Sequence, residues 1–365
     1  MNLQTDFLNW ASQWQQSFIH ETFTAAGRMA QLPTLVQRAQ RVRRAVSPSE
    51  VVYEEDRMKL LHYQREEKAK FRTPLVVVYA LVNRPYILDL KVGRSVVAHF
   101  IDRGFDTYLV DWGVPTYADR HLTFDDYING YLINVMDHLR ERTGAESLNV
   151  LAYCMGGTLT AMFTALHPSR VKNLILMAAP IDFATRDGLL NIWTRPESFD
   201  VDKFIDAFGN CPADFLQSSF LMLKPIANLV EKQINFVENL HDDKFVDDFL
   251  TTEAWLNDNI PIPGEIFRQF VKYLYQKNLL TRNRMPVGKH IVNLQDINCP
   301  VLNIMAGKDD LVPCSQGTPF TDLIGSKDRK TMVLQGSGHV GLAIGGRAQK
   351  EIWPSATEWL AERNS

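Results

Sequence analysis

An apolar run that ends at a cysteine and is followed by two glycines constrains this chain more than any other feature. Residues 148–158 read Leu-Asn-Val-Leu-Ala-Tyr-Cys-Met-Gly-Gly-Thr, which predicts a buried strand, a sharp turn at Cys154 and a helix from Met155. Such a turn exposes a nucleophile above a sheet, and its neighbours, here Ala152 and Gly156, must be small because bulk would block the turn. The helix dipole there favours a thiolate. The alternative is a buried, unreactive cysteine, which is the more common role of a free thiol.

An acid and a histidine follow Cys154 along the chain. Asp309 comes just after an apolar run at 300–306, and His339 lies on a glycine-rich loop just after another at 330–334. α/β hydrolases carry nucleophile, acid and histidine in this chain order, near strand ends. We therefore predict Cys154, Asp309 and His339 as a catalytic triad. The alternatives are an Asp309 that caps a turn and a His339 on the loop surface, because a triad is defined by geometry rather than by order.

The apolar runs also predict the fold class. They lack alternation, as strands buried on both faces do, and helical patterns separate them, which is typical of a mostly parallel, doubly wound sheet. The expected parallel strands are 75–79, 107–111, 148–152 and 173–178, and an expected hairpin spans 51–63. We predict an α/β-hydrolase fold whose core consists of residues 47–183 and 299–365, closed by a helix at 353–363.

Two further segments complete the expected organisation. Residues 1–46 form an N-terminal helical segment with an aromatic stripe of Phe7, Trp10, Trp14 and Phe18. Its helical spacing favours packing on the protein's own core over a partner face. Residues 184–298 are helical and rich in aromatic side chains, and they follow the strand after which α/β hydrolases accept insertions. We expect this segment to be a mobile cap with Cys154 buried beneath it.

Composition excludes several classes of function. A net charge of −3 argues against nucleic acid as a partner, and no apolar run approaches the ~18 residues of a membrane-spanning helix. The start of the chain lacks the pattern of a signal peptide. The cysteines show neither metal-ligand spacing nor disulfide density, so we expect a cytoplasmic protein without a metal site. These four cysteines are Cys154, Cys211, Cys299 and Cys314.

With these residues in place, the chain resembles the polyhydroxyalkanoate synthases, specifically the catalytic subunit of the short, two-subunit kind called class III. The matching segments are 74–90, 104–113, 124–131, the turn at Cys154, 223–225 and 264–270. Two departures stand out. Ala152 replaces the usual first glycine of the turn, and Asp310 replaces the histidine that usually follows the acid. Either aspartate could therefore orient His339, although the spacing from the strand and from Pro313 favours Asp309.

The resemblance implies an acyltransferase that polymerises (R)-3-hydroxyacyl-coenzyme A, expected to be short-chain, into polyester through an acyl-cysteine at Cys154, releasing coenzyme A. It implies the triad Cys154, Asp309 and His339 and no cofactor, since coenzyme A is part of the substrate and a product. It further implies a separate helical (PhaE-like) subunit as partner, and association with polyester granules in the cytoplasm. A homodimer is also expected.

Other candidate residues lie near the predicted nucleophile. The backbone N–H of Met155 and that of Val82, with Leu81 nearly as good a choice, are expected to hold the oxyanion. Arg84, Asp111 and Trp112 are candidate substrate-binding residues. For Arg84 the default is a solvated cation, and for Asp111 a carboxylate that binds loop amides is an equally open role.

Three other functions compete with the synthase. A cysteine hydrolase of the dienelactone-hydrolase or thioesterase type would share the turn and triad, but it would not explain the long aromatic insertion. A depolymerase would be expected to use serine. A non-catalytic, granule-associated acyl-binding protein would not need the three triad residues.

Overall fold

The computed structural model describes residues 45–364, which fall into two compact units. Of the described residues, one unit contains 45–223 and 258–364, and the other contains Lys224–Asn257. Almost all of the predicted N-terminal segment, including Phe7, Trp10, Trp14 and Phe18, lies outside the described residues.

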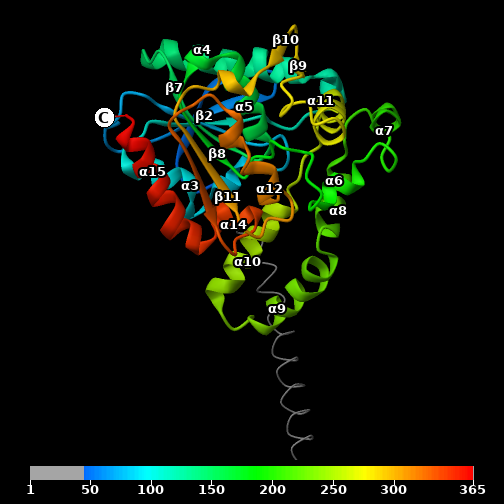
Figure 1. Ribbon diagram of the computed structural model, residues 1–365. Helices are drawn as coiled ribbons and strands as arrows, with labels where there is room; N and C mark the ends of the chain where they lie inside the picture. The colour runs from blue at the N-terminus through cyan, green and yellow to red at the C-terminus, as the bar shows by residue number, and fades with distance from the viewer. Residues whose placement is uncertain (1–44, 365) are drawn as a thin grey trace, which may run out of the picture. The chain divides into compact units, whose positions relative to one another are not determined.

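The larger unit is built on an eight-stranded, mostly parallel sheet (Figure 1). Its strands, in order across the sheet, are β1 (Ser49–Glu55), β2 (Met58–Tyr63), β6 (Thr107–Asp111), β3 (Leu75–Val78), β7 (Leu148–Tyr153), β8 (Val171–Met177), β11 (Val301–Ala306) and β12 (Arg329–Leu334). The β1–β2 hairpin is antiparallel to itself and to β6, and the strands from β6 to β12 run parallel. The predicted α/β-hydrolase sheet and its hairpin are confirmed.

The strand order places the ends of β3 and β7 at a topological switch point. The chain passes from β3 to β6 on one side and then crosses back to β7 on the other. Because such crossovers are right-handed, the connecting helices α3 (Val96–Arg103) and α4 (Ile133–Thr143) cover opposite faces of the sheet. Ligands of open α/β sheets bind at the carboxyl ends of strands at this point.

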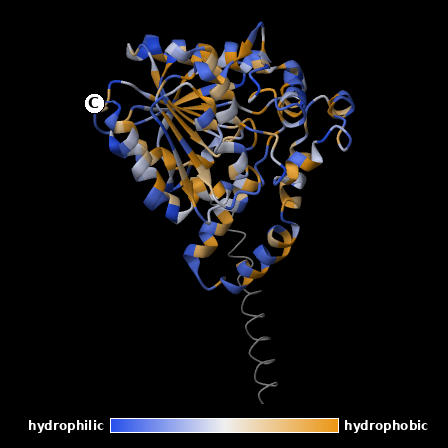
Figure 2. Ribbon diagram, in the orientation of Figure 1, coloured by the Kyte–Doolittle hydropathy of each residue, from blue (hydrophilic) through white to orange (hydrophobic). Residues whose placement is uncertain are grey.

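The sheet is apolar through its centre. Every residue of β3, β7 and β11 is buried, as expected for strands covered on both faces. Helix α15 (Trp353–Glu362) packs on α3, and α5 (Met155–Leu166) packs on the segment η3 (Asp126–Leu132) before α4. Figure 2 shows the central strands in the colours of high hydropathy and the surrounding helices in mixed colours.

Shorter elements connect these layers. They are η1 (Pro85–Leu88), β4 (Asp89–Lys91), β5 (Arg94–Ser95), η2 (Tyr117–His121), η4 (Pro168–Arg170), η7 (Leu294–Asp296), α12 (Cys314–Gly317), α13 (Phe320–Leu323), α14 (His339–Ile344) and η8 (Ala348–Ile352).

Most of the inserted segment belongs to the same unit as the sheet. It contains α6 (Leu189–Trp193), α7 (Val201–Phe208), α8 (Ala213–Met222), α11 (Gly264–Gln269), η6 (Phe270–Gln276) and a short hairpin of β9 (Met285–Val287) and β10 (His290–Val292). The segment is mainly helical, as its sequence indicates, although the hairpin was not expected. That residues 184–298 act together as a cap stays a prediction.

The smaller unit is helical where it is described. It consists of η5 (Ala227–Glu231), α9 (Lys232–Glu238) and α10 (Asp243–Leu256). Stacking of Phe236 on Phe249, with ring centroids 4.1 Å apart, joins α9 to α10, and Lys232 pairs with Glu253 at 2.9 Å. Within the described range, no helix of either unit has the length and apolar character needed to cross a membrane.

Candidate active site

Cys154 occupies a strained turn between β7 and α5. Its backbone has φ of 55° and ψ of −127°, a conformation that residues other than glycine rarely adopt. Two hydrogen bonds hold the turn: the Cys154 N–H donates to the Met177 carbonyl at 2.9 Å, and the Cys154 carbonyl accepts from the Gly157 N–H at 2.8 Å. Strain of this kind persists only where the surroundings determine it, and it is concentrated at functional sites.

The small residues around Cys154 are required by close backbone approach. A Cβ on Gly156 would lie 2.4 Å from the Tyr79 carbonyl oxygen, and one on Gly157 would lie 2.5 Å from the Ala179 Cβ. Ala152 is fully buried in β7 without a positive φ, so a methyl group fits where the related pattern has glycine.

This packing predicts the effect of one methyl group. Gly156→Ala should lower the free energy of unfolding by about 3 kcal/mol, because the added Cβ meets rigid backbone. Gly130→Ala is the matched control, since its Cβ would meet nothing within 4 Å and its φ is not positive. Chemical denaturation of both variants measures the difference. Equal stability of the two variants would contradict this account of the turn.

Asp309, which is buried, and His339, whose side chain is 11% exposed, form a pair at the carboxyl ends of β11 and β12. The His339 Nδ1 lies 2.7 Å from the Asp309 Oδ2. The other carboxylate oxygen of Asp309 accepts from the backbone N–H groups of Leu311 and Val312 at 3.0 and 2.9 Å, so the loop itself fixes the acid. Asp310 is exposed. His339 is the first residue of α14, at the end of the glycine-rich loop.

The same histidine reaches Cys154. The Cys154 side chain acts on the same imidazole, and with Nδ1 directed at Asp309 the ring nitrogen available to the thiol is Nε2. Burial alone would lower the pKa of His339, but the charges of Asp309 and Cys154 and hydrogen bonds to both outweigh it and raise that pKa to about 10. Cys154 itself is half-buried, less enclosed than the cap hypothesis anticipates.

The raised pKa of His339 has a consequence for stability. With an unfolded pKa of about 6.5, the protonated imidazole stabilises the fold fully below that pH and loses this contribution as the pH approaches about 10. The advantage of the wild-type chain over His339→Gln in unfolding free energy should therefore be larger at about pH 6 than at about pH 9. Denaturation of both proteins at the two pH values measures it. An advantage that grows with pH would have the wrong sign.

Aromatic side chains that the sequence analysis missed surround the pair. Tyr153 stacks on His339 with centroids 5.0 Å apart and donates its hydroxyl to the His339 carbonyl at 3.3 Å. Burial raises the pKa of Tyr275, and the charges of Cys154 and Asp309 raise it further, so this residue of η6 lies within electrostatic reach of both. Tyr153 could have been found as the neighbour of Cys154, whereas nothing near Tyr275 in the sequence marks it.

Comparison with known proteins shows to which family the chain belongs. A model of the alpha/beta hydrolase fold matches residues 73–345, and a model of the N-terminus of poly-beta-hydroxybutyrate polymerase (PhaC) matches residues 37–100. The chain is 43% identical over 327 residues to the poly(3-hydroxyalkanoate) polymerase subunit PhaC of Allochromatium vinosum, covering 89% of this chain and 91% of that protein. The chain belongs to the PhaC family.

Further comparisons agree with this assignment. The PhaC subunit of Haloferax mediterranei is 39% identical over 355 residues, covering 96% of this chain and 70% of that protein. A solved structure of a putative lipase from Sulfolobus solfataricus matches with a TM-score of 0.55 at 12% identity, covering 87% of this chain and all of that one. That likeness shows the fold alone. The predicted resemblance to polyhydroxyalkanoate synthases is confirmed.

The other predicted site residues of this PhaC chain are the oxyanion donors and the candidate substrate-binding residues. Met155 opens α5, so its N–H is one of those without a partner inside the helix. Val82, half-buried, and Leu81, buried, both lie in the loop after β3. Neither is singled out as an oxyanion donor by its contacts. Arg84 follows this loop and is half-buried.

Two further candidates have structural partners. The Trp112 indole donates to the Tyr79 carbonyl at 2.8 Å, so it braces the loop against which Gly156 packs. The Asp111 carboxylate accepts from the Gly113 N–H at 2.9 Å. The Asp111 contact is of the kind expected from its structural alternative, a carboxylate that binds loop amides.

The remaining cysteines of this PhaC chain are poorer nucleophile candidates. Burial raises the pKa of all three: Cys211, Cys299 and Cys314. The pKa of Cys299 rises to about 12, and the charges of Asp309 and Asp187 raise that of Cys314 further. Each thiolate is therefore disfavoured. In the part of the chain that the structure describes, no group of three or more His, Cys, Asp or Glu side chains could hold a metal ion.

Proposed function

We propose that this chain is the polymerising subunit of a polyhydroxyalkanoate synthase, which joins (R)-3-hydroxyacyl groups from coenzyme A thioesters into polyester. The observation that carries the proposal is a cysteine on a strained turn whose side chain acts on the imidazole of a hydrogen-bonded His–Asp pair, in a member of the PhaC family. Cys154 is the nucleophile, His339 the general base and Asp309 the residue that orients it. No cofactor is needed, because coenzyme A enters as part of the substrate.

The first half-reaction transfers the acyl group to the enzyme. His339 Nε2 holds the proton that Cys154 gives up, as the raised pKa of His339 favours, and the sulfur attacks the thioester carbonyl. The backbone N–H groups of Met155 and Val82, with Leu81 as the alternative to Val82, hold the oxyanion. The carbon–sulfur bond to coenzyme A then breaks, and the departing thiolate takes the proton from His339. The product is an acyl-cysteine, a thioester that preserves the energy of the original bond.

The second half-reaction forms the ester. The hydroxyl of another 3-hydroxyacyl group attacks the acyl-cysteine carbonyl while His339 takes its proton. The bond to Cys154 breaks, and the proton passes to the released sulfur. Water must lose this competition, and the aromatic surroundings of His339, including Tyr153 and Tyr275, favour that outcome.

The products distinguish this function from that of a cysteine hydrolase. Incubation with 3-hydroxybutyryl-coenzyme A should release free thiol and make the solution turbid with insoluble polyester. Thiol release with an equal yield of free 3-hydroxybutyrate and no polymer would instead establish a hydrolase. Absence of both thiol release and acylation of Cys154 would favour a non-catalytic acyl-binding protein.

We further propose a helical, PhaE-like partner subunit and a homodimer, acting at the surface of polyester granules in the cytoplasm. An apolar face in the smaller unit supports an interface. Ile226, Val230, Ile234 and Val237 recur at three- and four-residue spacing from just before η5 through α9, and all are exposed, Ile226 by 68%.

Partner dependence gives a kinetic prediction. The isolated chain should show a lag and low turnover, and added partner should remove the lag and raise the rate at least about 10-fold. Replacing Ile234, which lies in the middle of this face, with Asp should reduce that gain, because a buried charge opposes docking. Thiol release with and without the helical subunit measures both effects. Full, lag-free activity of the isolated chain would contradict the proposal.

A further inference from the structure

The larger unit contains a cavity past the end of β8 whose role the proposed mechanism leaves open. Its volume is about 510 Å³, within the range of small-molecule sites. Its walls come from the segment after β8, one residue of α6, the loop after α6 and one residue of η6. Its lining residues are Phe183, Ala184, Thr185, Arg186, Asn191, Arg195, Pro196, Glu197 and Tyr275.

Two arginines give the cavity its charge. Arg186 and Arg195 both line it and are exposed, and neither has an ion-pair partner within the described part of the chain. Glu197 is the one acid in the lining. The nearby Asp187 carboxylate already accepts the Ser315 hydroxyl, at 2.7 and 2.8 Å. Planar guanidinium groups suit phosphate oxygens, which they bind through paired hydrogen bonds.

A polar wall group also lacks a partner. The Thr185 Oγ1 is buried and makes no hydrogen bond within the described residues. Leaving a buried hydroxyl unpaired is costly, so a ligand atom that forms a hydrogen bond with Thr185 would be stabilised here. Asn191, by contrast, is fully engaged: it accepts from Gln316 at 2.7 Å and donates to the Phe183 carbonyl at 2.8 Å.

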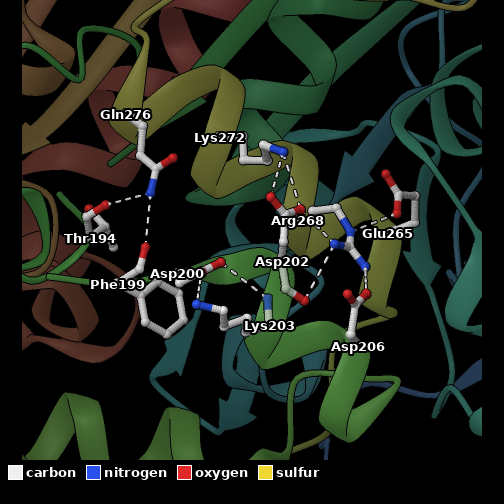
Figure 3. A network of polar contacts seen from close by, with 10 residues as sticks. All are labelled: Thr194, Phe199, Asp200, Asp202, Lys203, Asp206, Glu265, Arg268, Lys272 and Gln276. Atoms are coloured by element: carbon white, nitrogen blue, oxygen red, sulfur yellow. Dashed lines mark hydrogen bonds and ion pairs between the residues drawn. The ribbon is translucent and has the colours of Figure 1, made fainter. Parts of the chain in front are cut away.

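The arginine-bearing loop is held in place before any ligand binds. The Gln276 amide of η6 donates to the carbonyls of Thr194 and Phe199, at 3.0 and 3.2 Å, on either side of Arg195 (Figure 3). Beyond the loop, Asp202 of α7 pairs with Arg268 at 2.6 Å and with Lys272 at 2.8 Å, which ties α7 to α11 and η6. A wall fixed in this way loses little entropy on binding.

The cavity lies past the carboxyl end of β8, which stands between the strands that precede Cys154 and Asp309 in the sheet, and Phe183 and Tyr275 in its wall are in ring contact at 4.8 Å. Tyr275, the residue next to the Gln276 clamp, lines the cavity, and the charges of Cys154 and Asp309 both act on its hydroxyl. A ligand in the cavity therefore lies beside two cations at the edge of the sheet that carries the nucleophile. The growing polyester chain is neutral along its length, so cationic walls suit the phosphorylated acyl donor instead.

We propose that this cavity binds the phosphate-bearing portion of the acyl thioester, with Arg186 and Arg195 as its cationic contacts and Thr185 as a further hydrogen-bonding group. The inference rests on the proposed function, because it takes a coenzyme A thioester as the donor. The two arginines thereby take the substrate-binding role for which Arg84 was a candidate from the sequence.

Two donors with the same acyl group test the proposal. These are 3-hydroxybutyryl-coenzyme A and 3-hydroxybutyryl-N-acetylcysteamine, which lacks the phosphates. The double variant Arg186→Gln with Arg195→Gln should raise the KM for the coenzyme A ester about 10- to 100-fold relative to that for the short thioester. The control Arg72→Gln changes an exposed arginine just before β3, at the amino end of the parallel strands, and should leave the ratio of KM values unchanged.

Calorimetric binding of free coenzyme A provides a readout that does not need turnover. The double variant should bind it about 10- to 100-fold more weakly than the wild-type chain does. Unchanged affinity together with an unchanged KM ratio would overturn the inference, as would loss of the preference in Arg84→Gln instead. If the wild-type chain turns over neither donor even with the helical partner added, the proposed function fails, while arginine-dependent binding of coenzyme A would still support this cavity.

Discussion

Cys154→Ala is expected to lower coenzyme A release from 3-hydroxybutyryl-coenzyme A by about 10⁴-fold or more, because it removes the only atom that can carry the acyl group. The other thiols cannot substitute for it, since burial raises the pKa of Cys211, Cys299 and Cys314. Alanine keeps the small side chain that the turn requires, so the fold should survive. Thiol release and chemical denaturation measure the two properties separately.

Cys314→Ala is the matched control for this variant. Its sulfur donates to the Ala306 carbonyl at 3.2 Å, and the Asp309 charge acts on it, so it is a second thiol near the acid. It does not lie on a strained turn, and we expect it to retain most of the activity. Turnover by Cys154→Ala within about 10-fold of the wild-type rate would refute the assignment of the nucleophile.

Asp309→Asn should reduce turnover by about 10³- to 10⁴-fold. The Asp309 carboxylate accepts from His339 Nδ1 at 2.7 Å, and so keeps the tautomer in which Nε2 can accept the Cys154 proton. An amide can present its NH₂ group to the ring and favour the opposite tautomer. Steady-state thiol release measures the loss, and ring nitrogen shifts of His339 report the tautomer independently of activity.

The neighbouring acid supplies the control. Asp310 is exposed, whereas Asp309 is buried and held by two backbone N–H groups. We expect Asp310→Asn to change turnover less than about 3-fold. A greater loss in Asp310→Asn than in Asp309→Asn would reverse the roles of the two residues.

The sequence predicted those parts of the fold and site that depend on local patterns. Unbroken apolar runs mark β3, β7 and β11 because strands buried on both faces have no polar side. The small residues near Cys154 mark the turn because a Cβ there would strike backbone. The choice between Asp309 and Asp310 needed the structure, since burial and hydrogen bonds separate them and adjacent residues share the same local pattern.

Features that depend on contacts between distant segments could not be predicted in this way. Tyr275 lies near Cys154, and Gln276 holds the loop around Arg195, only because η6 packs near the strand ends. Aromatic residues are so frequent in the inserted segment that none of them stands out. The separation of Lys224–Asn257 as a unit of its own likewise follows from how the chain packs and has no linker-like composition to mark it.

Acylation of Cys154 is the central claim, and mass spectrometry of the trapped intermediate tests it most directly. Butyryl-coenzyme A can acylate the nucleophile but lacks the 3-hydroxyl needed for elongation, so the acyl-enzyme should accumulate. After rapid acid quenching and digestion, we predict one butyryl group on the peptide that carries Cys154, removable by hydroxylamine as a thioester is. A butyryl group on Cys211, Cys299 or Cys314 instead, or release of coenzyme A with no acylated cysteine at any time point, would contradict the mechanism.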